Sequence, residues 1–223
     1  MLPKAIFWDM DGTLVDSEPL WGIATYELSE RLGRRLTPEL REITVGGSFA
    51  HTLDVAAAHA GVELRPGDYE HHKQWMYARM AQLLEGSLEP NPGIRGLLAS
   101  LTAAGVPMMV TTNTERVLAD ACIAAVGADF FVGSIAGDEV ERAKPDPEMY
   151  MEAARRVGFG PAQCLVFEDS WAGMSAASAA GCTVLGLAAE VPAGVVPFDP
   201  GRFVGAGAAD VERWFSELGS SVR

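Results

Sequence analysis

The sequence predicts an α/β protein with a doubly wound, parallel-sheet (Rossmann-like) core and an inserted all-helical cap domain. Three observations indicate this fold. From residue 93 onward, short apolar segments alternate with helix-forming segments, which is typical of right-handed crossovers and a parallel sheet. Residues 17–89 instead look like consecutive helices without a convincing strand. The apolar segment Ala5–Trp8 ends in two carboxylates and a glycine, as expected of a buried strand that reaches a sheet edge.

The first strand delivers negative charge to that edge. Asp9 and Asp11 are two residues apart, so their side chains lean to one side while the backbone stays extended, and Gly12 then permits a turn. Two unit charges about 4 Å apart repel by about 4 kcal/mol at a surface-like effective dielectric. The pair therefore needs a cation, a shared proton or a phosphate-binding role, unless it is a solvated acidic turn.

The cap is expected to begin directly after this turn. Asp16-Ser17-Glu18-Pro19 is a strong helix start, with a capping oxygen, an acid for the helix dipole and a proline in the first turn. We expect helices to about Leu32, from Thr37, over 49–60 and over 68–84. Pro90-Asn91-Pro92-Gly93 marks the return. The predicted domains are therefore a core of residues 1–16 and 90–223 and a cap of residues 17–89.

The rest of the chain alternates strands and helices. Strands are expected at 106–112, 164–167 and 182–187, and helices at 94–104, 115–126, 147–157, 171–180 and 210–218. A short apolar segment lies near 130–135. Residues 188–207 are rich in Gly, Pro and Ala and are expected to be irregular. Ligands of such sheets bind beyond the carboxyl ends of the strands, so the residues that follow each strand are candidates for the site.

Composition restricts the partners. The 17 Lys and Arg residues against 30 Asp and Glu give a formal net charge of −13, which opposes nonspecific attraction to nucleic acid or an anionic membrane. No apolar run approaches the ~20 residues of a membrane span, and the amino terminus leads straight into the first strand without a signal peptide. Cys122, Cys164 and Cys182 lack Cys-x-x-Cys spacing and are expected to be buried thiols. We expect a monomeric cytoplasmic protein.

Four motifs lie at the expected strand ends or in a loop that connects the elements. They are Asp9-Met10-Asp11-Gly12-Thr13-Leu14-Val15-Asp16, Thr112-Asn113, Lys144-Pro145-Asp146-Pro147 and Glu168-Asp169-Ser170. In this order they strongly resemble the four motifs of the haloacid dehalogenase-like (HAD) superfamily of phosphatases. The extension Asp16-Ser17-Glu18-Pro19-Leu20-Trp21 looks most like the sugar-phosphate phosphatases close to β-phosphoglucomutase.

The resemblance implies a chemistry for each motif. Asp9 would be the nucleophile that forms an aspartyl phosphate, and Asp11 the acid and base. Thr112, Asn113 and Lys144 would bind the phosphate. Mg²⁺, the cofactor that hard oxygen ligands favour, would be ligated by Asp9 and Asp169 directly, by the backbone carbonyl of Asp11 and by Glu168 through water. The expected enzyme is a phosphoric monoester hydrolase for a small phosphorylated metabolite, such as a sugar or polyol phosphate.

The cap residues expected to face the substrate are Glu18, Trp21 and Phe49, in the turn Gly46-Gly47-Ser48-Phe49. Each also has an ordinary structural interpretation, respectively a helix-dipole partner, a core aromatic and a turn residue. The alternative function is a β-phosphoglucomutase-type phosphomutase. A mutase of this family carries a cap arginine at the place of Phe49 and a histidine at the place of Trp21, so a phosphatase is favoured, although Arg41 or Arg65 could compensate. A phosphoaccepting receiver domain is a remote alternative, which the order of the motifs disfavours.

Overall fold

The computed structural model describes residues 2–45, 48–84 and 88–221. Contacts between Cα atoms divide the chain into two compact units. The first joins Met1–Asp16 to Glu89–Arg223, and the second is Ser17–Leu88. The sheet lies in the first unit, and the second unit is helical wherever the structure assigns it regular secondary structure. Among the described residues, no helix is both long and apolar enough to cross a membrane.

The first unit is built on one parallel sheet with the strand order β3-β2-β1-β4-β5-β6. The strands are β1 (Ala5–Trp8), β2 (Met108–Thr111), β3 (Gly133–Ile135), β4 (Cys164–Glu168), β5 (Thr183–Gly186) and β6 (Val196–Pro197). The chain starts in the middle of the sheet, extends it to one side with β2 and β3, and then crosses to the other side. The doubly wound fold predicted from the sequence is confirmed, and it places the ends of β1, β2 and β4 next to one another.

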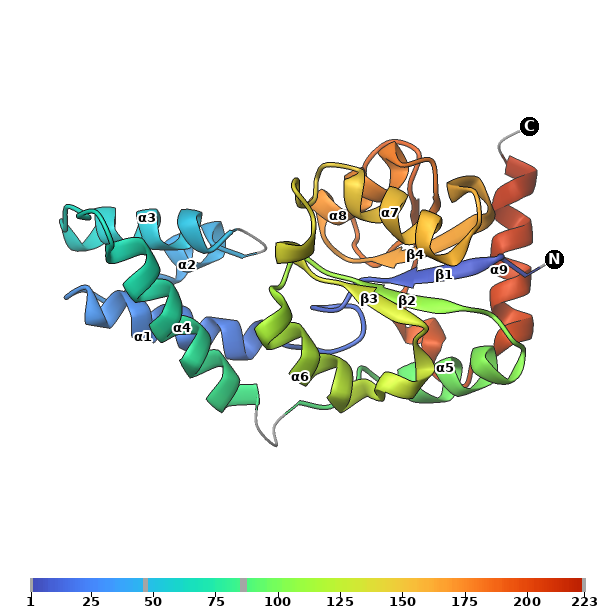
Figure 1. Cartoon of the computed structure of the whole chain (residues 1–223), viewed down its shortest axis with the longest axis horizontal. Helices are drawn as coiled ribbons and strands as arrows, with labels where there is room; N and C mark the ends of the chain where they lie inside the picture. Colours follow the sequence, from blue (N-terminus) through green and yellow to red (C-terminus); the bar gives the residue numbers. More distant parts are fainter. Residues whose placement is uncertain (1, 46–47, 85–87, 222–223) are drawn as a thin grey trace. The chain divides into compact units, whose positions relative to one another are not determined.

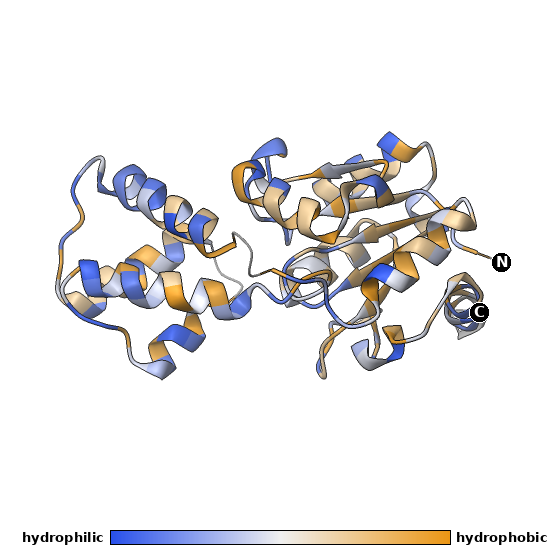
Figure 2. Ribbon diagram, turned by 90° about the horizontal axis from the view of Figure 1, so that it is seen from below, coloured by the Kyte–Doolittle hydropathy of each residue, from blue (hydrophilic) through white to orange (hydrophobic). Residues whose placement is uncertain are grey.

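Helices cover both faces of this sheet (Figure 1). In Figure 1, α7 and α8 lie above it and α5 and α6 below it. The helices of this unit are α5 (Ile94–Ala103), α6 (Arg116–Val126), α7 (Glu148–Val157), α8 (Trp171–Ala179) and α9 (Ala208–Ser221), with short 3-10 turns at 128–130, 137–139, 161–163 and 200–203. The hydropathy colouring of Figure 2 shows largely apolar strands between helices of mixed polarity. This pattern agrees with strands that are buried on both faces.

The two faces have separate packing partners. Alternation along β1 directs Ala5 and Phe7 into the cluster that also contains Tyr150 of α7. Trp8 belongs to the opposite face, where it stacks on Phe167 of β4 with ring centroids 4.4 Å apart. Asp9 follows Trp8 and therefore continues the Phe7 face, which is the one that α7 covers. The hydrophobic alternation of the strand thus determines which helix the first acid meets.

In its described residues, the second unit contains the helices α1 (Glu18–Arg31), α2 (Pro38–Ile43), α3 (Phe49–Ala60) and α4 (Asp68–Leu84). Its core includes Leu28, Leu53 and Met80, which are at most 1% exposed. Ser17 precedes α1, but its side chain makes no capping hydrogen bond, contrary to the expectation from the sequence. Ser48 does cap α3, since its hydroxyl accepts a hydrogen bond from His51 N at 3.3 Å.

Two short strands lie in segments that the sequence did not predict as strands. The apolar segment near 130–135 follows the start of a 3-10 turn at 128–130, and its residues Gly133–Ile135 pair with β2. Residues 188–207, expected to be irregular, contain the edge strand β6, which pairs with β5 over two residues. Both strands are too short for a sequence period to be recognised, and Pro197 of β6 is tolerated because the strand lies at the sheet edge.

Candidate functional site

The four predicted motifs meet at the carboxyl edge of the sheet. Trp8 is in register with Val110 of β2 and with Phe167 of β4, so the residues after these three positions leave the sheet at one level. Asp9 N donates to Phe167 O at 3.0 Å, which extends the pairing of β1 and β4 to the first acid. Asp9 and Glu168 therefore stand side by side, and the register of the sheet sets their separation.

Lys144 supplies a buried cation between these two acids. Its Nζ lies 2.7 Å from Asp9 Oδ1, 2.6 Å from Glu168 Oε1 and 2.9 Å from the Thr111 carbonyl oxygen. An ammonium has three protons, so each proton has one acceptor. Burial lowers the pKa of Lys144, but Asp9 and Glu168 outweigh burial and hold the pKa well above its usual value. The lysine is thus a fixed positive charge.

Glu168 is fully buried and uses both of its oxygens inside the protein. Oε1 accepts hydrogen bonds from Lys144 Nζ and, at 3.1 Å, from the Tyr150 hydroxyl. Oε2 accepts from Ser170 N and Ser170 Oγ, both at 2.9 Å. The same Ser170 hydroxyl caps α8 by accepting from Gly173 N at 3.0 Å. Glu168 therefore connects Lys144 to the beginning of α8.

Negative charge exceeds positive charge in this cluster. Ligand oxygens of Asp9, Glu168 and Asp169 lie within 4.8 Å of one another, and Lys144 is the one cation that the hydrogen bonds of the described residues place among them. Burial and the Glu168 carboxylate raise the pKa of Asp9 well above its usual value and raise the pKa of Asp169 to about 7. The raised pKa values mean that Asp9 and Asp169 resist ionisation until further positive charge is present.

The donor set fits a hard divalent cation. All three ligand groups are carboxylates, the ligand type that Mg²⁺ prefers. Gly12, with a φ of 83°, lets its backbone approach Asp169 so closely that a Cβ would lie 1.9 Å from Asp169 Oδ2. Any other residue at this position would displace that carboxylate. The turn after the first acid is therefore shaped to admit the second acidic strand end.

Asp11 is held by two threonines after β2. Thr114 Oγ1 donates to Asp11 Oδ2 at 2.7 Å, and Thr112 Oγ1 lies 3.4 Å from the same oxygen. The Asp11 side chain is not a member of the acidic cluster of Asp9, Glu168 and Asp169. Thr114 was not identified from the sequence, although its spacing of two residues from Thr112 matches that of the Asp9 and Asp11 pair.

Asn113 has a different contact from the one expected. Its side-chain amide does not point to a free phosphate position but binds the Lys144 backbone: Oδ1 accepts from Lys144 N at 3.0 Å and Nδ2 donates to Lys144 O at 3.2 Å. The Asn113 side chain thus links two loops, and its contact with phosphate stays a prediction. The loop after β3 supports this link, because a Cβ on Gly137 would lie 2.1 Å from Asn113 O.

The cap candidates lie in the helical unit, and their role toward a substrate stays a prediction. The Arg41 guanidinium donates to the Glu18 carboxylate. The Phe49 ring packs edge-on against Tyr69 and Tyr77, with centroids 5.2 and 6.2 Å apart. Trp21 is partly buried on α1. The predicted turn residues Gly46 and Gly47 lie outside the described residues.

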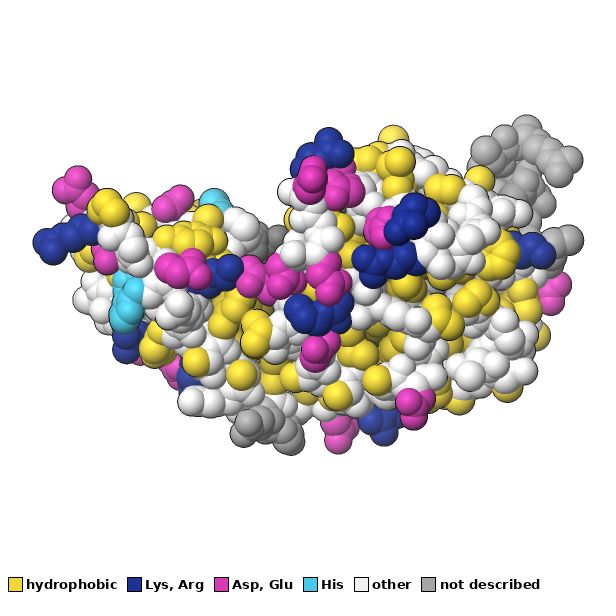
Figure 3. Space-filling model, in the orientation of Figure 1, with side chains coloured by type: hydrophobic (Ala, Val, Ile, Leu, Met, Phe, Trp, Pro, Cys, Tyr) yellow, Lys and Arg dark blue, Asp and Glu magenta, His cyan; other side chains and the backbone are white. Residues whose placement is uncertain are grey.

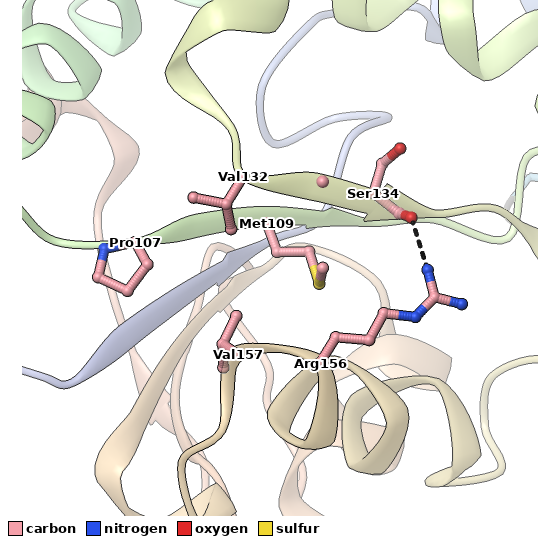
Figure 4. Close-up of a pocket in the computed structure, with 7 residues that line it drawn as sticks. Pro107, Met109, Val132, Ser134, Arg156 and Val157 are labelled. Carbon is pink, nitrogen blue, oxygen red and sulfur yellow. Dashed lines mark hydrogen bonds between the residues drawn. The ribbon is translucent and has the colours of Figure 1, made fainter.

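A cavity of about 410 Å³ lies away from this chemistry (Figure 4). Its lining consists of Pro107, Met109, Val132, Gly133, Ser134, Arg156 and Val157. Most of these residues precede or begin β2 and β3, whereas the acidic cluster follows the strand ends. Arg156 Nη1 donates to Ser134 O at 3.2 Å and its Nε to Glu152 Oε1 at 2.8 Å, so the guanidinium is already paired. We therefore assign the chemistry to the carboxyl edge.

Charged side chains elsewhere form neighbouring pairs of opposite sign. On the face shown in Figure 3, basic side chains lie beside acidic ones. Examples are Arg116 with Glu139 at 2.6 Å and Arg156 with Glu152 at 2.8 Å. A face of this kind offers no extended positive surface to a nucleic-acid backbone.

Comparison with known proteins agrees with this geometry. The family model described as haloacid dehalogenase-like hydrolase matches residues 3–181. A fructose-1-phosphate phosphatase of Escherichia coli is 33% identical over 180 residues, which cover 79% of this chain and 92% of that protein. A phosphorylated carbohydrates phosphatase of Thermotoga maritima is 28% identical over 179 residues, or 80% of this chain and 82% of the relative.

Solved structures show the same fold. The structure of a putative β-phosphoglucomutase from Thermotoga maritima superimposes with a TM-score of 0.69 at 25% identity and covers 96% of this chain and 98% of its own. The CbbY protein of Rhodobacter sphaeroides, solved in complex with xylulose 1,5-bisphosphate, gives a TM-score of 0.73 at 28% identity over 83% of this chain and 86% of its own.

Proposed function

Because the chain belongs to the haloacid dehalogenase-like hydrolase family, we propose that it is a Mg²⁺-dependent phosphatase of a small phosphorylated sugar or polyol. The observation that carries this proposal is the Lys144 ammonium, bound between Asp9 and Glu168 at the strand ends, with Asp169 in the same cluster. Such a site combines a nucleophile, a fixed cation and a set of metal ligands. The names of the two relatives, which specify fructose 1-phosphate and phosphorylated carbohydrates, support the substrate class.

The proposed reaction consists of two successive displacements at phosphorus. In the first, an Asp9 carboxylate oxygen forms a bond to phosphorus while the bond to the leaving oxygen breaks, and Asp11 gives its proton to the leaving alcohol. In the second, Asp11 takes a proton from water, the water oxygen attacks phosphorus, and the Asp9 carboxylate leaves with release of inorganic phosphate. The Thr114 hydrogen bond keeps the Asp11 carboxyl in place for both proton transfers.

Phosphate recognition is assigned to Lys144 and to the end of β2. With substrate bound, a phosphoryl oxygen can take the place of one of the three present acceptors of the ammonium, and the Thr112 hydroxyl can turn from Asp11 to donate to another phosphoryl oxygen. Because the Asn113 amide is used by Lys144, we assign Asn113 the role of a support and retain only its backbone N–H as a donor to phosphate.

Asp9 and Asp169 would hold the Mg²⁺ with their side chains and Asp11 with its backbone carbonyl, and Glu168 would contribute through water. The ion supplies positive charge that offsets the carboxylates and the phosphate. Since both Glu168 oxygens already accept two hydrogen bonds each, its contribution to the ion is the weakest of the four. We also propose that the enzyme is monomeric and cytoplasmic, consistent with three cysteines that form no disulfide.

Replacement of the nucleophile tests the proposal. We expect Asp9→Asn to lower turnover of a phosphate monoester with Mg²⁺ by more than ~10³-fold and to abolish phosphorylation of the protein. Circular dichroism should show an unchanged fold. The matched control is Asp129→Asn, because Asp129 is an exposed carboxylate outside the cluster. Activity of Asp9→Asn within about tenfold of the parent, or ~1.4 kcal/mol in barrier, would contradict the covalent mechanism.

A phosphomutase is the alternative activity, because a structure described as a putative β-phosphoglucomutase shares the fold at 25% identity. A mutase must bind a second phosphate, for which a free arginine is suited. Arg41 is only 8% exposed, and its guanidinium donates to Glu18 and to Thr44 Oγ1 within the helical unit. With β-glucose 1-phosphate and a catalytic amount of the 1,6-bisphosphate, we expect phosphate release without isomerisation. Glucose 6-phosphate forming faster than phosphate by orders of magnitude would establish the mutase.

A further inference from the structure

Tyr150 places a hydroxyl in the core beside the lysine-binding acid. It lies on α7, is 0% exposed, and packs its ring against Phe7 with centroids 6.5 Å apart. The hydroxyl donates to Glu168 Oε1 at 3.1 Å. A phenylalanine would fill the same apolar space without an oxygen that has to be satisfied, and a buried hydroxyl without a partner costs about 1–3 kcal/mol. Packing alone therefore does not account for a tyrosine here.

The acceptor of this hydroxyl has little freedom to move. Glu168 Oε2 is held by Ser170, and the space behind the carboxylate is occupied by the backbone of α8. A Cβ on Gly173 would lie 1.5 Å from Glu168 Oε1 and 2.4 Å from Oε2. The carboxylate is thus confined between the helix start on one side and Lys144 and Tyr150 on the other. A hydrogen bond donated to Oε1 therefore changes the charge and the orientation of the Glu168 carboxylate but leaves the carboxylate at the same place.

That same oxygen competes with Asp9 for the lysine. Lys144 Nζ is 2.6 Å from Glu168 Oε1 and 2.7 Å from Asp9 Oδ1, so the two acids share the ammonium almost equally. A hydrogen bond from Tyr150 takes up part of the negative charge on Oε1 and weakens its attraction for Lys144. The Tyr150 ring also lies 5.3 Å from Nζ, but a phenylalanine would retain that contact. The hydroxyl therefore has its own effect on the lysine.

We propose that Tyr150 is a positioning residue for the phosphatase reaction: through Glu168, its hydroxyl keeps the Lys144 ammonium directed to Asp9 and to the phosphoryl group. The proposal rests on the proposed function, because Lys144 must bind a phosphoryl oxygen for its position to matter. Without the hydroxyl, Glu168 draws the ammonium toward itself. The electrostatic stabilisation of the transition state then falls, while the nucleophile and the metal ligands stay in place.

Tyr150→Phe removes only this oxygen and is the variant to test. With p-nitrophenyl phosphate and Mg²⁺, we expect kcat to fall about 5- to 20-fold and KM to change less than about twofold, as for an interaction made mainly in the transition state. The matched control is Tyr26→Phe, which keeps the ring that Arg35 covers in the helical unit. In a Lys144→Ala background, Tyr150→Phe should have no further effect on kcat, because its target is gone.

A measurement that needs no turnover separates this proposal from the proposed function. In ¹⁵N-lysine-labelled protein, the buried Lys144 ammonium should give a slowly exchanging NMR signal, which Tyr150→Phe should shift and broaden and Tyr26→Phe should leave unchanged. A parent enzyme that hydrolyses no phosphate ester would refute the proposed function and leave this spectral test in force. An unchanged Lys144 signal in Tyr150→Phe would overturn the positioning role. So would an equal loss of kcat with and without Lys144, which would indicate a packing effect.

Discussion

Gly173, in the first turn of α8, sets how closely this helix can approach the acid at the end of β4. Alanine is about 1 kcal/mol better than glycine inside a helix, so local propensity would favour alanine here. The contacts oppose it, because a Cβ would lie 2.0 Å from Glu168 Cδ and 1.5 and 2.4 Å from the two carboxylate oxygens. Glycine at this position therefore makes room for the Glu168 carboxylate, although it is less favourable than alanine for the helix.

We expect Gly173→Ala to destabilise the protein by about 1–3 kcal/mol, as overpacking of a closed site does, and to lower kcat at least about tenfold. The control is Gly96→Ala in α5, where a new Cβ meets no atom of the described residues within 4 Å. That control should stabilise by about 0.5–1 kcal/mol with unchanged kcat. Thermal unfolding and turnover measure both effects, and two variants of equal stability would refute the role given to Gly173.

Single residues also show where reading the sequence succeeds. Asp9 and Asp169 were predicted because charged residues at the ends of buried strands are typical of a binding site, and Lys144 because its loop resembles the third motif of the family. The structure brings the three residues together. Tyr150 and Thr114 were not predicted for the site, since a tyrosine in an amphipathic helix is usually a core residue and a threonine after a strand is usually a turn or capping residue. Their contacts depend on side-chain directions that only the packed core defines.

At the level of elements, the lysine loop is positioned by the end of a neighbouring strand. The Asn113 side chain follows β2 and binds both polar groups of the Lys144 backbone. The sequence predicted that the Asn113 side chain binds phosphate, since an amide after a strand can bind an anion as readily as a peptide group. To predict the contact with the Lys144 backbone, one would need the distance in space between two loops that are 31 residues apart along the chain. No local sequence pattern contains that distance.

Helix positions were predicted well where the chain carries its own signals. The ranges 49–60 and 68–84 match α3 and α4, because Ser48 caps one and Gly61 ends it in a left-handed conformation. In the last helix, α9, Trp214 packs against Phe198, which follows the edge strand β6, with centroids 4.7 Å apart, and lies near Phe167 of β4, at 6.5 Å. Aromatic contacts of this kind are set by tertiary packing and have no local signature.

At the scale of the whole molecule, the chain leaves the sheet unit and returns to it at one place. Val15 and Pro90 form an antiparallel bridge, and Asn91 Nδ2 donates to the carbonyl oxygens of Gly12 and Thr13 at 3.1 and 2.9 Å. The ends of the inserted segment are therefore adjacent within the sheet unit. Closing such a gap with a short loop costs little conformational entropy.

We accordingly expect the sheet unit to fold when a short Gly-Ser linker replaces residues 17–88. Far-UV circular dichroism and a cooperative thermal transition would measure this. The truncated protein should still release phosphate from p-nitrophenyl phosphate but lose preference among sugar phosphates, since the substrate candidates Glu18, Trp21 and Phe49 are removed. An unfolded product would show that the two units depend on each other for stability.

The stacked pair of Trp8 and Phe167 has a consequence for how such enzymes diversify. Each aromatic ring directly precedes an acid, and together they lock β1 to β4 in the register that sets the spacing of Asp9 and Glu168. The segment that joins the bridged residues Val15 and Pro90 lies outside that register. The insertion can therefore become longer or be exchanged without moving the carboxylates of Asp9 and Glu168. The bridge between Val15 and Pro90 is the boundary between the segment that is free to vary and the strands that hold the acids.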